Sequence, residues 1–130
     1  MIVLDASVVV ELLLGGERAM ALHARCPAPG ESWHAPSLVG VEVLSVLRRL
    51  NRSRQLSDLR GRQALRDLPL LGLRLHDTAS LLPRAWVLRA NLSAYDAMYV
   101  ALAEGLRAPL LTLDGRMAAT SGHHARIELL

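Results

Sequence analysis

Four acidic residues stand far apart along the chain, and each interrupts an otherwise apolar stretch. They are Asp5, Glu42, Asp96 and Asp114. An ionised carboxylate in apolar surroundings is costly unless a partner compensates its charge. Four such residues predict a shared cation, and ligation by carboxylate oxygens alone suits a hard ion such as Mg²⁺ or Mn²⁺. A hard cation of this kind promotes the attack of water on phosphodiesters, because it screens their charge and stabilises the leaving oxygen.

Each acid taken alone also has an ordinary structural explanation. Asp5 could cap a helix that follows a strand, and the helix dipole could stabilise Asp96 in a first turn. Asp114, which precedes a glycine, could belong to a simple turn. Glu42 fits such explanations least well, because a solvated glutamate is not expected among the aliphatic residues that surround it. Together the four acids indicate a shared site far more specifically than any one of them does.

Short apolar runs alternate with segments of helical composition. The runs predict five strands, at Met1–Leu4, Trp33–Ala35, Gly72–His76, Pro109–Leu113 and Arg126–Leu130. The helical segments are Ala6–Leu14, Glu17–Arg25, Pro36–Asn51, Ser57–Leu68, Thr78–Ala90 and Ala94–Leu106. The proline-rich segment 26–32 is expected to be a loop. The alternation predicts one α/β domain, residues 1–130, with a mainly parallel sheet of four to five strands.

The predicted elements place the acids at functionally favourable positions. Parallel sheets gather ligand residues at the carboxyl ends of their strands, and Asp5 and Asp114 each follow a predicted strand. Asp96 falls in the first turn of a helix for which Ser93 is a good N-cap. Glu42 falls inside the helix that opens at Pro36, about two turns from its start. We therefore expect the four side chains to converge at one edge of the sheet.

The basic residues favour contact with phosphates. All 15 are arginines, and the formal net charge is +3. Seven of them lie between Arg48 and Arg66, where the only acid is Asp58. They form either a solvated surface of two helices or a rim that contacts the phosphates of a nucleic acid, because the planar guanidinium matches phosphate oxygens. The candidates for this contact are Arg48, Arg49, Arg52 and Arg54.

The rest of the composition narrows the class of protein. Cys26 is the only cysteine, so no internal disulfide is possible, and we expect it to be a small core residue. Asp5 and Glu11 interrupt the N-terminal apolar run, so it does not resemble a signal peptide. No uncharged apolar run is long enough to span a bilayer. These features predict a cytoplasmic protein.

The acids and their neighbours resemble those of PIN-domain ribonucleases, specifically VapC-type toxins of toxin–antitoxin modules. Ile-Val-Leu-Asp-Ala-Ser-Val-Val-Val is similar to the first family motif, and Leu-Leu-Thr-Leu-Asp to the fourth. Pro-Ser-Leu-Val-Gly-Val-Glu-Val carries the helical glutamate. Leu-Ser-Ala-Tyr-Asp-Ala-Met-Tyr-Val-Ala-Leu-Ala resembles the third motif, which is highly specific. The resemblance covers essentially the whole chain.

The resemblance implies a three-layer α/β/α sandwich and a Mg²⁺-dependent endoribonuclease toxin, with Mn²⁺ as an alternative ion. It assigns catalysis and metal binding to Asp5, Glu42, Asp96 and Asp114. By the same resemblance Ser7 and Thr112 are polar helpers that orient the ligands. The implied partners are an RNA substrate, a VapB-type antitoxin and a second copy of the chain in a homodimer. Some family members carry a further acid after the fourth one, but here Gly115 follows, so the number of metal ions stays open.

Two other functions remain open from the sequence. A haloacid-dehalogenase-like phosphatase also has an acid after its first strand, but it needs a second acid two residues later, where Ser7 stands. A receiver-like or scaffold domain could bind Mg²⁺ without catalysis, and it would not need Glu42. His123-His124 lacks the spacing of a zinc site. Asp77, after a predicted strand, is expected to cap a helix.

Overall fold

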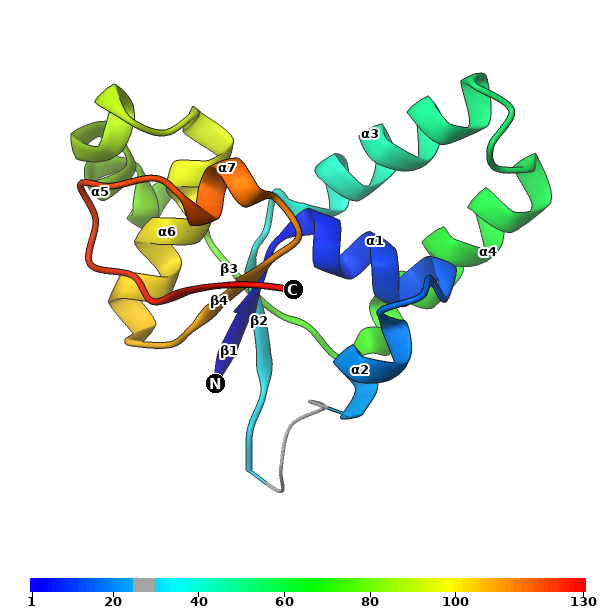
Figure 1. Cartoon of the computed structure of the whole chain (residues 1–130), viewed down its shortest axis with the longest axis horizontal. Coiled ribbons are helices and arrows are strands. Elements are labelled where there is room, and N and C mark those ends of the chain that lie inside the picture. The colour runs from blue at the N-terminus through cyan, green and yellow to red at the C-terminus, as the bar shows by residue number, and fades with distance from the viewer. Residues whose placement is uncertain (25–29) are drawn as a thin grey trace.

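Residues 1–24 and 30–130 are described by the computed structural model, in which five parallel strands form one sheet between helices (Figure 1). The strands are β1 (Ile2–Leu4), β2 (Trp33–Pro36), β3 (Arg74–His76), β4 (Leu110–Thr112) and β5 (Ile127–Leu129). Their order in the sheet is β3-β2-β1-β4-β5, so β1 is central. The structure confirms the predicted α/β class and the parallel sheet.

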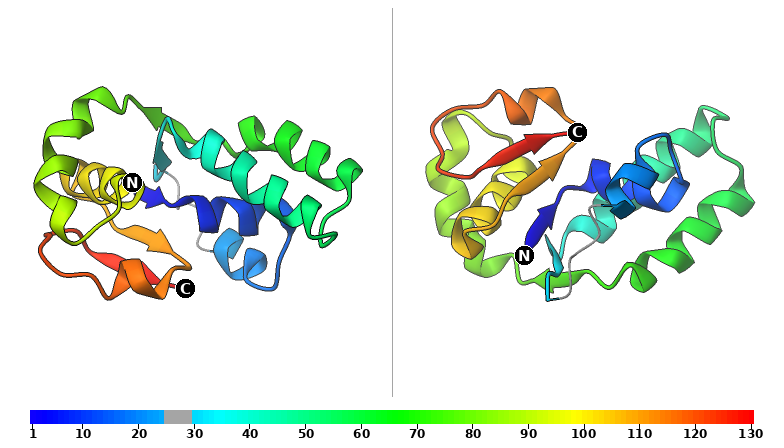
Figure 2. Two further views of the ribbon diagram at one scale, coloured as in Figure 1. Left: turned by 90° about the horizontal axis from the view of Figure 1, so that it is seen from above. Right: turned by 60° about the horizontal axis from the view of Figure 1, so that its bottom comes forward.

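Helices cover both faces of the sheet, which makes the three layers that we expected (Figures 1 and 2). On one face α6 packs against β1, β2 and β4, and α5 packs against α6. On the other face α1 packs against β4 and against α3. The α-helices are α1 (Ala6–Leu14), α2 (Ala19–Ala24), α3 (Val39–Arg52), α4 (Asp58–Asp67), α5 (Leu82–Val87), α6 (Ala94–Leu106) and α7 (Gly115–Ala118). Short 3₁₀ turns occupy Leu68–Leu71, Ala79–Leu81 and Leu88–Ala90.

The core is aliphatic and is centred on β1, β4 and α6. All three residues of β1 and of β4 are buried, as expected for central strands of a parallel sheet covered on both faces. The middle of α6, Ala97–Ala103, is buried without interruption, so this helix is enclosed on all sides. Ser93 caps α6 by accepting a hydrogen bond from the Asp96 amide at 3.1 Å. None of the helices in the described ranges is both long and apolar enough to cross a membrane.

Helices α3 and α4 form a hairpin that projects away from the sheet (Figures 1 and 2). The inner side of α3 buries Val39, Val43 and Leu47, which follow the spacing of one helix face. Its outer side carries charged residues and two exposed aliphatic side chains, Val41 and Leu44. The first turn of α3 stays close to the sheet, and the arginines farther along the helix extend into solvent.

Several predicted elements differ from the structure. Pro36 ends β2, where it pairs with His76 of β3, so α3 starts only at Val39 and Glu42 lies in its first turn. The chain is held in this register because the Ser37 amide donates to the His76 carbonyl at 2.8 Å. The expected helix 78–90 is divided into two 3₁₀ turns and α5, with proline in the first turn of α5. Helix α7 has only four residues, too few for a recognisable hydrophobic period.

Other local expectations have mixed outcomes. Ser57 caps α4 as predicted, with its hydroxyl accepting from the Arg60 amide at 3.1 Å. Asp77 caps the turn that follows β3, because its carboxylate accepts from the Ser80 amide at 3.3 Å. Cys26, expected to be a small core residue, lies outside the described residues.

Two histidines join the neighbouring strands β2 and β3. Nδ1 of His34 lies 2.8 Å from Nε2 of His76, and Nε2 of His34 lies 2.7 Å from the Ser32 hydroxyl. One imidazole must accept in the bond between the rings, so the pair cannot keep this bond with both rings charged. The pKa of His34 is lowered, first by burial and then by the positive charges of His76, Arg74 and the N-terminal amine.

This pair predicts that the protein loses stability in mild acid. The folded state favours neutral His34, whereas the unfolded chain takes up a proton near pH 6.5. The stability that neutral His34 contributes is therefore fully present above about pH 6.5. Below that pH the free energy of unfolding decreases by up to about 1.4 kcal/mol per pH unit. Urea unfolding at a series of pH values measures it. His34→Asn should flatten this dependence and the exposed control His124→Asn should not; equal slopes in both variants would contradict the prediction.

Candidate active site

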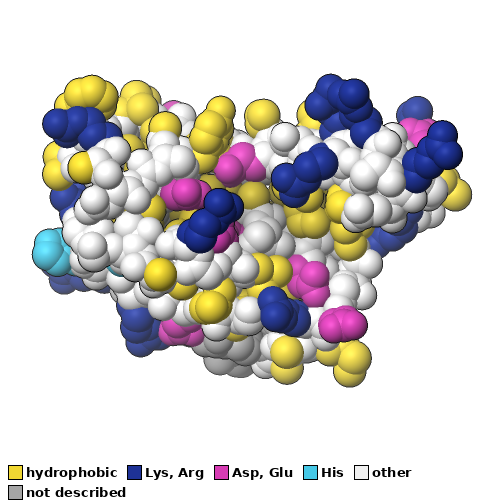
Figure 3. All heavy atoms as spheres, turned by 45° about the horizontal axis from the view of Figure 1, so that its top comes forward, with side chains coloured by type: hydrophobic (Ala, Val, Ile, Leu, Met, Phe, Trp, Pro, Cys, Tyr) yellow, Lys and Arg dark blue, Asp and Glu magenta, His cyan; other side chains and the backbone are white. Residues whose placement is uncertain are grey.

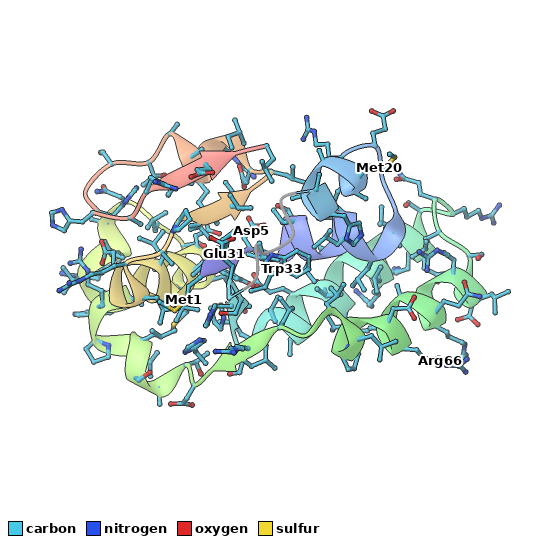
Figure 4. The ribbon with its side chains drawn as sticks, turned by 90° about the horizontal axis from the view of Figure 1, so that it is seen from below. Met1, Asp5, Met20, Glu31, Trp33 and Arg66 are labelled. Atoms are coloured by element: carbon cyan, nitrogen blue, oxygen red, sulfur yellow. The ribbon has the colours of Figure 1, made fainter. Side chains whose placement is uncertain are left out.

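Asp5 is the buried centre of the candidate site. It follows β1, and its side chain is only 4% exposed. Oδ1 accepts hydrogen bonds from the Ser7 hydroxyl at 2.5 Å and from the Val8 amide at 3.0 Å, and Oδ2 accepts from the Thr112 hydroxyl at 2.5 Å. Asp5 is thus the N-cap of α1, one of its two expected roles, but the bond to Thr112 also ties it to the neighbouring strand. These bonds fix the carboxylate at the carboxyl end of the sheet (Figure 4).

The hydroxyls of Ser7 and Thr112 connect the ends of β1 and β4. The parallel register pairs Leu4 with Leu111, which brings the next residues of both strands side by side. The Ser7 hydroxyl donates to Asp5 and accepts from the Leu113 amide at 3.0 Å. The Thr112 hydroxyl donates to Asp5 and accepts from the Asp114 amide at 2.9 Å. Both residues that the sequence singled out as polar helpers therefore contact the Asp5 carboxylate.

Glu42 lies in the first turn of α3 and is half-buried. Its Oε2 accepts a hydrogen bond from the Tyr99 hydroxyl of α6. The pKa of Glu42 is raised, mainly by burial; the bond from Tyr99 opposes this change, and the negative charges of Asp5 and Asp96 add to it. Burial raises the pKa of Tyr99, and the hydrogen bond to Glu42 and the negative charges of Glu42, Asp5 and Asp96 raise it further, so this phenol stays protonated and donates. Asp5, Glu42 and Asp96 are therefore close enough to interact through their charges.

Asp96 and Asp114 sit at the starts of two helices. Asp96 accepts from the Ser93 hydroxyl at 2.8 Å through Oδ2, within the cap of α6. Asp114 caps α7, accepts from the Arg116 amide at 2.8 Å, and has the Arg116 Nε 3.5 Å away. The Thr112 hydroxyl joins the Asp114 backbone amide to the Asp5 carboxylate.

Acidic side chains gather on one face of the molecule. The space-filling view shows acidic side chains gathered around a depression, with apolar atoms inside it and arginines beside it (Figure 3). Glu42, Asp96 and Asp114 are partly exposed, whereas Asp5 is buried. The contacts join the Asp5 carboxylate to the Asp114 backbone through Thr112, and the convergence of all four side chains in one pocket stays a prediction.

The donor chemistry of the candidate site fits a hard divalent cation. Every candidate ligand is a carboxylate oxygen, and within the described part of the chain no protein donor reaches Oε1 of Glu42 or Oδ1 of Asp96. Among residues 1–24 and 30–130, no three His, Cys, Asp or Glu side chains form a ready-made metal-binding cluster. Mg²⁺ does not require one, because it keeps several waters and usually takes one or two carboxylates.

Tyr99 is the residue that the sequence reasoning missed. It lies three residues after Asp96, and residues at this spacing share one face of a helix. That spacing was a usable signal, because a tyrosine beside an expected ligand can donate to another one. Its partner Glu42 is 57 positions away, however, so the contact itself was not predictable from local sequence.

The arginine candidates lie on the projecting hairpin. All four are exposed, and none of them forms an ion pair with another described residue; they are Arg48, Arg49, Arg52 and Arg54. Other arginines of the same segment have structural partners: the Arg60 guanidinium donates to the Leu13 carbonyl, and Arg62 pairs with Asp58. Arg52 is ten residues beyond Glu42, about 15 Å along the helix. The free arginines therefore continue outward from the acidic hollow.

Comparison with known proteins identifies the family. The sequence model of the PIN-domain family matches residues 2–122 of this chain. Ribonuclease VapC12 of Mycobacterium tuberculosis is 41% identical over 130 residues, covering 100% of this chain and 99% of the relative. The VapC ribonuclease Mb0985 of Mycobacterium bovis is 43% identical over 120 residues, covering 92% of this chain and 91% of the relative.

Solved structures agree on the fold. VapC20 of Mycobacterium tuberculosis, described as a toxin that cleaves the sarcin–ricin loop, superposes with a TM-score of 0.69 at 22% identity over 92% of this chain and 94% of that one. VapBC2 of Rickettsia felis, bound to a DNA fragment of its promoter, gives 0.72 at 16% identity over 100% of this chain and 99% of that one. With the motifs, the sheet and the grouped acids, these similarities show that the chain belongs to the PIN-domain family and to its VapC-type members.

Proposed function

We propose that this protein is the endoribonuclease toxin of a type II toxin–antitoxin system and acts in the cytoplasm. The observation that carries this proposal is the buried carboxylate of Asp5 at the end of β1, held at both oxygens by the hydroxyls of Ser7 and Thr112. The relatives that match over most of the chain are named ribonucleases. A haloacid-dehalogenase mechanism has no support here, because Ser7 stands where the second acid is required and its hydroxyl is bonded to Asp5.

The proposed reaction is hydrolysis of RNA phosphodiester bonds with Mg²⁺, or Mn²⁺ in its place. Asp5, Glu42, Asp96 and Asp114 would hold the ion, which supplies charge screening and an activated water. Ser7 and Thr112 keep the Asp5 carboxylate in one orientation by donating to both of its oxygens. Clustered carboxylates raise one another's pKa values, as the charges around Glu42 do, and a cation relieves this repulsion.

A cleavage assay tests the proposal directly. The purified protein is incubated with total RNA in the presence of Mg²⁺, Mn²⁺ or a chelator, and the new RNA ends are mapped. We expect cleavage at a small set of positions with either ion and none with the chelator. Cleavage that is indifferent to the chelator would exclude the metal-dependent mechanism, and intact RNA under all conditions would exclude the nuclease.

The free arginines of the hairpin are proposed to contact RNA phosphates. Replacing Arg52 and Arg54 together by Ala should weaken RNA binding about equally for different sequences, and it should reduce the slope of log affinity against log salt by about 1 to 2 units. Arg126→Ala is the matched control, since its guanidinium already pairs with Glu128 at 2.7 Å. Binding measured at several salt concentrations decides the question: an unchanged slope in the double variant would leave these arginines as a solvated surface.

The proposed partners are a VapB-type antitoxin and a second copy of the chain. A groove of about 250 Å³ runs between α3 and α4 and has Leu44, Leu47 and Leu65 in its walls, which suits an apolar partner segment. A basic side chain of the antitoxin would pair with the acids of the site and compete with the cation.

Co-expression with the neighbouring antitoxin gene should relieve growth arrest. Persistent growth arrest would contradict the proposed antitoxin, and a purified protein that is monomeric would contradict the proposed homodimer.

A further inference from the structure

We propose that Tyr99 is a positioning residue of the metal site, whose hydroxyl holds Glu42 toward Asp5 and Asp96 against the repulsion between their charges. The inference rests on the proposed function, because it concerns the same carboxylates. It assigns a role to a side chain that binds neither the ion nor the RNA. Its basis is the contact between α6 and α3, the burial of Tyr99 and the distribution of hydrogen bonds on Glu42.

The Tyr99 hydroxyl is committed to Glu42. The side chain is 1% exposed, so water has little access to it. Its hydroxyl donates to Oε2 of Glu42 and forms no other hydrogen bond within the described part of the chain. A buried hydroxyl without a partner is costly, so each member of the pair favours keeping the other in place.

Glu42 needs such a donor in order to stay in the site. Glutamate has several rotatable side-chain bonds, so its carboxylate can take more than one position. Glu42 lies in the first turn of α3 beside a solvent-exposed side of the helix, where Val41 is 69% exposed. The charges of Asp5 and Asp96 repel an ionised Glu42. Without the cation, rotation toward water would relieve that repulsion. The bond from Tyr99 opposes this rotation, and Tyr99 itself cannot move because it is embedded in the core side of α6.

The hydrogen bonds leave one oxygen of Glu42 for the cation. Oε2 is taken by Tyr99, whereas no donor from the described residues reaches Oε1. A ligand with one oxygen anchored loses less conformational freedom when the ion binds, so the same contacts give a higher affinity. Partners that orient a metal ligand typically change metal affinity by about 10- to 100-fold when they are removed.

The test is a Mn²⁺ titration of the purified protein by calorimetry, without RNA. Tyr99→Phe removes the hydroxyl but keeps the ring, and Tyr95→Phe, on the same helix with a side chain 60% exposed, is the matched control. We expect Tyr99→Phe to weaken Mn²⁺ binding about 10-fold or more. Tyr95→Phe should bind within about twofold of the unchanged protein, since no hydrogen bond of its hydroxyl links it to the site.

A second readout separates positioning from a purely structural role. If Tyr99 positions Glu42, the Mn²⁺ concentration for half-maximal RNA cleavage should rise by the same factor in Tyr99→Phe, while the rate at saturating Mn²⁺ should approach that of the unchanged protein. A structural defect would instead lower the rate at every Mn²⁺ concentration and lower the melting temperature. That second pattern would overturn the inference.

The outcomes also distinguish this inference from the proposed function. If the unchanged protein binds Mn²⁺, Asp5→Asn does not, and Tyr99→Phe binds normally, the metal site stands and the role of Tyr99 falls. Tighter binding by Tyr99→Phe would overturn the inference as well, because Tyr99 would then be a competitor of the ion. If the unchanged protein binds no Mn²⁺, the metal-dependent function falls and the inference falls with it.

Discussion

Asp5→Asn should lower the rate of RNA cleavage by about 10³-fold, because it removes a ligand charge at almost constant side-chain volume. Charge stabilisation at such a site contributes several kcal/mol to the transition state, and each 1.36 kcal/mol corresponds to about tenfold in rate. The measurement is the initial rate of cleavage at saturating Mg²⁺. The effect should exceed that of any other single change considered, since Asp5 is the one buried acid of the four.

The fold of Asp5→Asn should survive. Asparagine is as good an N-cap as aspartate, so the bond from the Val8 amide that starts α1 can remain. The amide nitrogen that replaces Oδ2 cannot accept from the Thr112 hydroxyl, so this bond is lost, and the relief of repulsion with Glu42 offsets part of that loss. We therefore expect the free energy of unfolding to change by no more than about 1 kcal/mol.

The matched control for this variant is Asp67→Asn, an exposed acid at the end of α4 without a side-chain hydrogen bond. It makes the same change of charge and should cleave RNA at the normal rate. Full activity of Asp5→Asn would exclude the proposed mechanism. An equal loss in both variants would mean that overall charge, and not ligation at the end of β1, limits cleavage.

Thr112→Val should cost the largest loss of stability of the changes proposed, about 2 kcal/mol. Thr112 is completely buried, and its hydroxyl both donates to Asp5 and accepts from the Asp114 amide. Valine keeps the shape of the side chain but leaves a buried carboxylate oxygen and a backbone amide without their partner. Hydrogen bonds to charged groups contribute about 1.5 to 3 kcal/mol to stability. Removal of one partner of a buried bond leaves the other partner without a hydrogen bond, so stability falls by a similar amount.

Urea unfolding of Thr112→Val measures this loss. The control is Thr120→Val, because the Thr120 hydroxyl forms a single hydrogen bond, to the Arg116 carbonyl, at an exposed position where water can replace it. The control should lose no more than about 0.5 kcal/mol. Equal stability of the two variants would show that the link between the ends of β1 and β4 contributes nothing to the fold.

Local sequence determined much of this protein. The strands β1 and β4 were predictable because each is a short, mainly apolar run followed by an acid, and burial on both faces of a parallel sheet favours that pattern. The capping roles of Ser57 and Ser93 were predictable because a hydroxyl and the amide three residues later are neighbours in any helix. The same locality made Asp5 and Asp114 candidates, since residues that follow parallel strands lie at one edge of the sheet.

Where a helix starts was only partly a local matter. Pro36 looked like the first residue of a helix, but the strand pairing with His76 extends β2 through it and delays α3 to Val39. As a result Glu42 lies in the first turn, near the sheet, and not two turns away from the helix start. Pairing between strands that are 40 residues apart in the sequence overrode the local preference of proline.

Only the tertiary structure decided which side chains meet. The bond between Tyr99 and Glu42 joins helices from different parts of the chain, and the bond between His34 and His76 depends on the order of the strands. The physical reason is range: capping and apolar periodicity act between neighbours along the chain, whereas hydrogen bonds and charge interactions across the core exist only after the whole sheet has brought distant residues together.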